Sequence, residues 1–154
     1  MLWTAFYNLH QAKIHIVGFT PRHESKIILA MQRAYDNSSI FRKMLDDWVS
    51  WPAPDNNIKI SYLQDEARAW PDVDPNGDRG TVELDVAFCE GMKYITDSGE
   101  VVNHELDTVL IHELGHALTG RLDDGAWIEN DPIWGPWFNR DRTDYKGANV
   151  YRIK

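Results

Sequence analysis

Residues 112–118 read HELGHAL and place two histidines four positions apart, with a glutamate directly after the first. On a helix, residues four apart lie one above the other, so the imidazoles of His112 and His116 can reach one metal ion. Glu113 then lies beside the position of a metal-bound water. The stretch predicts a catalytic zinc site with Glu113 as general base. Two ordinary histidines on an amphipathic helix are the alternative, which leaves the position of the glutamate to chance.

A catalytic zinc site needs three protein ligands and an open position for water. No histidine follows His116, so a third histidine after the motif is excluded. We expect a carboxylate, or less commonly a tyrosine, to complete the site. The acidic residues available after the motif are Asp123, Asp124, Glu129, Asp131, Asp141 and Asp144.

The stretch His112 to His116 resembles the signature of zincin metallopeptidases. HELGHALTG, followed by a loop and DYKGANVYR, resembles bacterial effector-type zinc metallopeptidases over about the last third of the chain. The resemblance implies an α+β fold, in which a small mixed sheet and a supporting helix accompany the active-site helix that carries HELGH. It also implies a protein or peptide substrate that pairs with an edge strand, and residues 81–86 match that strand by position.

The same resemblance favours Asp144 as the third zinc ligand, because Asp144 opens the helix expected at residues 145–153. Glu129 and Asp123 are the next candidates. The sequence departs from the family at Ala148, where relatives tend to have an acid. Asp144 lies one helical turn earlier, so it can serve on the same face.

The motif and the resemblance together predict a zinc metalloendopeptidase in which Glu113 takes a proton from the zinc-activated water. The side chains that can stabilise the oxyanion are Arg142, Tyr145, Tyr151 and Arg152. An alternative is a zinc-stabilised binding module that no longer cuts peptides. A third hypothesis is an interaction domain built on a calcium loop, with an incidental HELGH.

The calcium hypothesis comes from residues 72–83, whose spacing of acids, amide and glycine fits the loop of a calcium-binding EF-hand. Pro71 disfavours an incoming helix, and Glu83 lies in an expected strand, so the paired helices of an EF-hand are missing. A hairpin turn stabilised by Asx turns explains the same residues. Calcium at the Asp72 to Glu83 loop is therefore the secondary metal prediction.

Hydrophobic periodicity predicts the elements that must position these groups. Residues 13–19, 58–62 and 81–88 alternate as half-buried strands do, and a further short strand is expected at 92–95. Thr20 and Pro21 begin one long or two short helices that extend to Trp48, with a break near Ser38. We expect Asn103 to cap the HELGH helix and Gly120 to end it. Leu106, Leu110, Leu114 and Ala117 form a stripe that can pack on the sheet.

Composition limits the remaining possibilities. A chain of 154 residues fits one domain, residues 1–154, which can be part of a longer protein. The net charge of −8 disfavours a nucleic-acid partner. Cys89 is the single cysteine and fits a buried structural thiol. The N-terminal residues fit neither a signal peptide nor a membrane span, so we expect a cytoplasmic protein, or one secreted without a cleaved signal.

The tryptophans of the loop after the motif, Trp127, Trp134 and Trp137, have two equal interpretations. They line a substrate cleft or a partner surface, or they seal the core under a long loop. His104 and Glu105 precede His112 by about two helical turns, so we interpret them as capping residues rather than a second metal pair.

Overall fold

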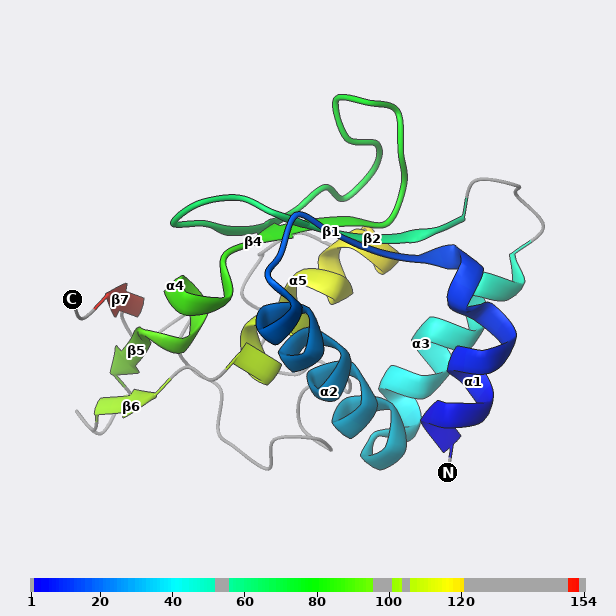
Figure 1. Ribbon diagram of the computed structural model, residues 1–154, viewed down its shortest axis with the longest axis horizontal. Coiled ribbons are helices and arrows are strands. Elements are labelled where there is room, and N and C mark those ends of the chain that lie inside the picture. Colours follow the sequence, from blue (N-terminus) through cyan, green and yellow to red (C-terminus); the bar gives the residue numbers. More distant parts are fainter. Residues whose placement is uncertain (1, 52–55, 96–100, 104–105, 121–149, 153–154) are drawn as a thin grey trace.

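The computed structural model describes residues 2–51, 56–95, 101–103, 106–120 and 150–152 of the chain. In this part of the chain, five α-helices and a short 3₁₀ helix accompany two small β-sheets, so the fold is mixed α+β (Figure 1). The elements are α1 (Leu2–His10), the 3₁₀ helix Gln11–Lys13, β1 (Ile14–Val17), α2 (Pro21–Asn37), α3 (Ser39–Ser50), β2 (Ile58–Tyr62), β3 (Ala67–Ala69), β4 (Thr81–Leu84), α4 (Val86–Glu90), β5 (Met92–Ile95), β6 (Val101–Asn103), α5 (Leu106–Thr119) and β7 (Val150–Arg152).

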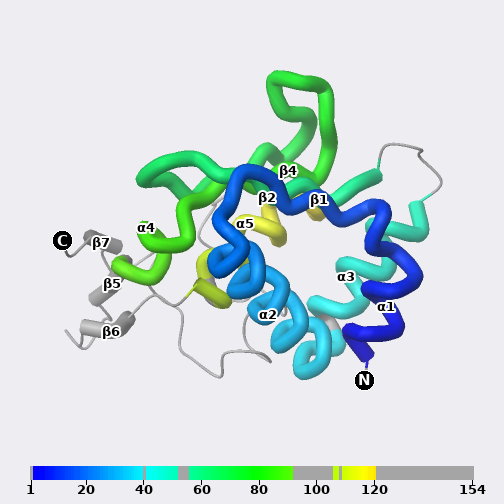
Figure 2. Tube along the Cα trace, in the orientation of Figure 1, coloured from blue at the N-terminus to red at the C-terminus, as the bar shows by residue number. Residues whose placement is uncertain are grey.

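The larger sheet has the strand order β1-β2-β4-β3, in which β1, β2 and β4 are parallel and β3 is antiparallel. Its buried face carries Ile58, Ile60, Val82 and Leu84, which alternate along β2 and β4. Helices α1, α2, α3 and α5 lie on one side of this sheet, and the loop between β3 and β4 projects from the other side (Figures 1 and 2). One hydrophobic core therefore lies between the sheet and the helices.

The strand order contradicts the prediction that residues 81–86 form an edge strand. Strand β4 lies between β2 and β3, so residues 81–86 do not form an edge. The edge strand beside β4 is β3, which no pattern in the sequence indicates. Ala67, Arg68 and Ala69 form a strand too short to show a clear alternation, and alanine has a low strand propensity.

The expected strand at 81–88 is also too long. It ends at Leu84, because Asp85 caps α4 by accepting hydrogen bonds from the N–H groups of Ala87 (3.1 Å) and Phe88 (3.4 Å). The other carboxylate oxygen of Asp85 accepts from the N–H of Asp65 at 3.1 Å. The buried side chain of Asp85 thus ends the strand and begins a helix within an apolar segment whose alternation is typical of a strand.

The region between β1 and β2 contains two helices, which decides between the two arrangements that the sequence allowed. Thr20 Oγ1 accepts from the N–H of His23 at 3.2 Å, with Pro21 as the first residue of α2, as expected. The helix stops at Asn37, and Ser38 Oγ then accepts from the N–H of Phe41 at 3.1 Å. The predicted break is therefore the N-cap of a second helix, α3.

The first helix, α1, was not predicted as an element, although its apolar residues have helical spacing. Trp3 and Phe6 are buried and pack against Tyr35 of α2, with ring centroids 5.7 Å and 4.7 Å apart. The N–H of Trp3 also donates to Asp36 at 2.7 Å. Aromatic packing of this kind anchors the N-terminal helix on α2.

The second sheet has the order β6-β5-β7 and is antiparallel. The strand expected at 92–95 is confirmed as β5, but it belongs to this sheet and not to the larger one. Residues 150–152 form β7, so the helix expected at 145–153 is wrong at these three positions, where backbone pairing with β5 prevails. Asn103 ends β6, and residues 104–105 between it and α5 lie outside the described residues, so the cap expected at Asn103 stays a prediction.

Within the described residues, no helix has both the length and the apolar character that crossing a membrane requires.

Candidate metal centre

Helix α5 carries the HELGH motif, as the sequence predicts, and both of its ends are fixed. In its first turn, Asp107 receives two hydrogen bonds of 2.7 Å from the guanidinium of Arg33 on α2. At its other end, Gly120 adopts a φ of +72° and donates its N–H to the carbonyl of His116 at 2.9 Å. Glycine tolerates this left-handed conformation without strain, so the predicted stop is confirmed.

The apolar stripe of α5 packs as expected. Leu106, Leu110, Leu114 and Ala117 are all buried, and α5 contacts β3 and β4 of the larger sheet as well as α2. A helix packed on several sides has little freedom to rotate about its axis. The packing of α5 therefore also fixes the orientation of the motif side chains that lie outside the apolar stripe.

The two motif histidines face each other at a hydrogen-bonding distance. Their Nε2 atoms are 3.0 Å apart, and the rings are nearly perpendicular, at 89° with centroids 4.5 Å apart. His112 is 4% exposed and His116 is 7% exposed. At this distance one ring nitrogen can donate a hydrogen bond to the other, or both lone pairs can face the same cation.

The donor set fits zinc. A tetrahedral zinc with bonds of about 2.0–2.1 Å holds two ligand nitrogens about 3.3 Å apart, close to the separation of the two Nε2 atoms. Two neutral imidazoles on one helix are also the ligands that zinc prefers. The described geometry therefore matches two of the three expected ligands.

Glu113 is partly exposed and lies about 100° around the helix from His112. It is close enough to Cys89 of α4 that its negative charge acts on the thiol. Burial first, and then the charges of Glu113, Asp85 and Glu90, raise the pKa of Cys89 above its usual range. Cys89 is fully buried and forms no disulfide, so the prediction of a buried thiol is confirmed.

The three candidates for the third ligand, Asp144, Glu129 and Asp123, all lie outside the described residues. The candidate oxyanion stabilisers Arg142 and Tyr145 lie outside them too, as do His104, Glu105 and the three loop tryptophans. Among the residues that the structure describes, no three His, Cys, Asp or Glu side chains gather around one point. Asp144 therefore stays a prediction.

The loop at 72–83 is organised around Asp74, which is 6% exposed. Its Oδ1 accepts from the N–H groups of Asn76 (2.8 Å) and Asp78 (3.0 Å), and its Oδ2 accepts from Thr81 Oγ1 (2.8 Å) and Lys59 Nζ (3.2 Å). Burial alone disfavours the charged carboxylate, but these hydrogen bonds outweigh it and lower the pKa of Asp74.

Lys59 also donates to Asp78 at 3.0 Å, so an ammonium group lies between two of the loop carboxylates. Glu83 accepts from the side chains of Arg68 and Trp70. These contacts are those of the hairpin-turn alternative, in which Asx turns shape the loop. Calcium binding at the Asp72 to Glu83 loop stays a prediction.

No protein-family model, curated protein or solved structure matches this chain.

Proposed function

We propose that this chain is a zinc-dependent metalloendopeptidase with a zincin-like arrangement. The observation that carries the proposal is the pair of buried imidazoles whose Nε2 atoms are 3.0 Å apart on one helix, with Glu113 directly after the first. A structural histidine pair needs no glutamate at that position. A peptidase needs one as its base.

The fold supports the same interpretation. A small mixed sheet, a helix (α2) on the same side of the sheet as α5, and the histidine helix α5 itself are the parts that the resemblance implies (Figure 1). Arg33 of α2 supports α5 directly through Asp107.

Strand β3 is suited to bind an extended substrate. Glu66 and Trp70 hydrogen-bond with β4 through their backbones, as alternate residues of an antiparallel pair do. Ala67 and Ala69 therefore present their N–H and C=O groups to the other edge, where no described strand pairs with β3. An extended peptide can add to such an edge.

His112 and His116, with an acid that we propose to be Asp144, would hold the zinc ion. When bound, zinc polarises the scissile carbonyl and lowers the pKa of its water to roughly 7. The Glu113 carboxylate takes the proton from that water and delivers it to the leaving amine. Both imidazoles are buried, and electrostatic interactions are stronger in such surroundings than in bulk water.

Removal of the metal tests the proposal. We expect about one zinc per chain by mass spectrometry, and we expect 1,10-phenanthroline to abolish cleavage of a peptide library. Zinc should restore cleavage after the chelator is removed, and calcium should not. Zinc without cleavage would favour the binding module, and calcium without zinc would favour the calcium-loop domain. Cleavage that survives complete removal of zinc contradicts the proposal.

The third ligand has its own test. If Asp144 binds zinc, Asp144→Ala should weaken zinc affinity roughly 100-fold, because each ligand of a zinc site contributes on the order of 3 kcal/mol. Glu129→Ala and Asp123→Ala serve as matched controls and should change affinity by less than about threefold. Competition with a chromogenic chelator measures all three. A loss confined to Glu129→Ala or Asp123→Ala would transfer the assignment to that residue.

A further inference from the structure

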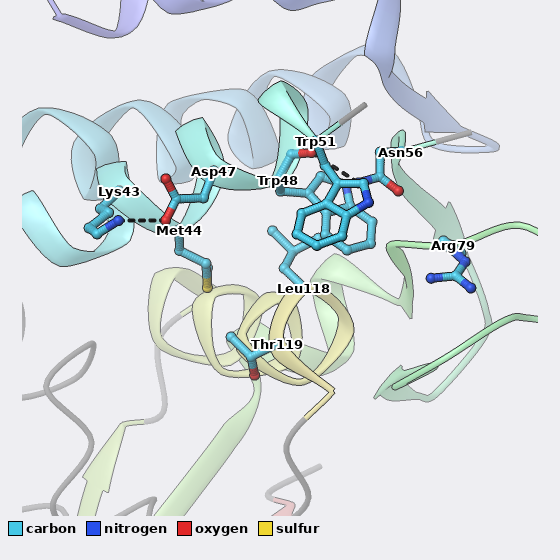
Figure 3. Close-up of a pocket in the computed structure, with 9 residues that line it drawn as sticks. All are labelled: Lys43, Met44, Asp47, Trp48, Trp51, Asn56, Arg79, Leu118 and Thr119. Carbon is cyan, nitrogen blue, oxygen red and sulfur yellow. Dashed lines mark hydrogen bonds and ion pairs between the residues drawn. The ribbon is translucent and has the colours of Figure 1, made fainter. Parts of the chain in front are cut away.

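A cavity of about 480 Å³ lies between the end of α3 and the last turn of α5 (Figure 3). The side chains of Met44 and Leu118 extend into the space between the two helices, and Leu118 lies beneath Trp48 and Trp51. This volume lies within the roughly 300–1,000 Å³ that is typical of small-ligand sites. The cavity can therefore hold one or two large side chains.

The aromatic wall of the cavity is fixed on one side and open on the other. Trp48 donates its indole N–H to the carbonyl of Asn57 at 3.0 Å, and Gly80 packs directly on its ring. A Cβ at Gly80 would lie 2.2 Å from Asn57 O and 2.9 Å from the Trp48 ring, and the φ of +71° also favours glycine. Trp51 is 64% exposed, so it forms an accessible apolar face.

The polar groups differ between the two ends of the cavity (Figure 3). At one end, Lys43 and Asp47 neutralise each other through a 2.7 Å ion pair. At the other end lies Arg79, whose guanidinium has no ion pair or hydrogen bond with any residue that the structure describes. A ligand with a negative group is therefore complementary to the Arg79 end.

Asn56 contributes a polar amide group to the lining of the cavity. It is 4% exposed and lines the cavity, and its side-chain N–H₂ donates to the carbonyl of Trp48 at 3.1 Å. Its amide oxygen lies on the side away from that bond and has no hydrogen bond within the described residues (Figure 3). A buried acceptor of this kind is stabilised by a donor from a ligand, such as a peptide N–H.

The cavity is separate from the histidine pair. Leu118 follows His116 by two residues, so it points about 200° around the helix from that imidazole. His116 and Leu118 both belong to the C-terminal half of α5.

We propose that this cavity is an exosite that binds a substrate segment in which a large aromatic residue stands next to an acidic one. The aromatic ring packs between the two indoles and Leu118. The acidic group binds Arg79 through paired hydrogen bonds, and a backbone N–H of the segment donates to Asn56. The assignment to a substrate rests on the proposed peptidase function, whereas the binding itself does not.

Direct binding tests the proposal with a defined probe, the blocked dipeptide acetyl-Phe-Asp-amide. In the Glu113→Gln protein, which is used to suppress any cleavage of the probe, saturable NMR shifts of the Trp48 and Trp51 indole N–H signals are expected. Trp48→Phe and Trp51→Phe assign those signals. Acetyl-Ala-Asp-amide and acetyl-Phe-Asn-amide should each bind at least about fivefold more weakly. Equal affinity for all three dipeptides, or no saturable shift with the first, overturns the proposal.

Two variants separate the parts of the site. Trp51→Ala and Arg79→Gln should each raise the Kd of acetyl-Phe-Asp-amide about tenfold, and Arg79→Gln should not change the Kd of acetyl-Phe-Asn-amide. Leu9→Ala and Arg22→Gln alter exposed residues elsewhere and should have no effect. Binding that survives both cavity variants overturns the exosite even if zinc and cleavage are found. Binding without cleavage overturns the peptidase function and leaves the aromatic-acidic site in place.

Discussion

Replacing Glu113 with glutamine is expected to lower kcat for peptide hydrolysis by roughly 10²–10⁴-fold, the usual contribution of a general base. The amide has nearly the same shape as the carboxylate but cannot accept the proton of the attacking water. Zinc content and melting temperature should stay at wild-type values, because the two imidazoles are unchanged. Steady-state kinetics on the first cleaved peptide, with zinc measured on the same sample, checks both parts.

The matched control for this variant is Glu24→Gln, which makes the same chemical change on the exposed first turn of α2. It should leave kcat within about twofold of wild type, since surface substitutions have small effects. A Glu113→Gln protein with near-normal turnover would exclude Glu113 as the base, even if zinc is bound.

Replacing His112 or His116 with alanine is expected to remove zinc and activity together. One ligand is worth on the order of 3 kcal/mol, so zinc affinity should fall roughly 100-fold or more. Zinc should raise the melting temperature of the wild-type protein, because a ligand that binds only the folded state stabilises it. In both variants this increase should disappear at zinc concentrations that saturate the wild type.

The control for the histidine variants is His15→Ala, which removes an exposed imidazole from β1. It should keep both the bound zinc and the thermal response to zinc. If the two motif variants retain a full equivalent of tightly bound zinc, the ion is held elsewhere in the protein.

Features that depend on neighbouring residues were predictable from the sequence. The approach of His112 to His116 follows from the helical repeat alone, and the caps at Thr20 and Gly120 use contacts within a few residues. The stripe of leucines on α5 follows from the same periodicity. These predictions need a correct helix and no knowledge of what packs around it.

Features that depend on distant residues were not predictable in this way. Asp85 ends a strand-like run partly through its bond to Asp65, twenty positions earlier in the sequence. The edge position of β3 depends on the order in which strands assemble, and no alternation in Ala67 to Ala69 signals it. The proposed third zinc ligand has the same difficulty, because the approach of a distant acid to two histidines would leave no local pattern in the sequence.

The parallel pairing of β1 with β2 has a consequence for biosynthesis. Residues 14–62 form a contiguous strand-helix-helix-strand unit, so half of the larger sheet is already translated about fifty residues before His112 leaves the ribosome. The nascent chain can begin to form the core that contains Ile27, Phe41 and Ile58 before the candidate metal ligands are synthesised. Early assembly thus precedes the candidate metal site, and the proposed binding of zinc would belong to the final stage of maturation.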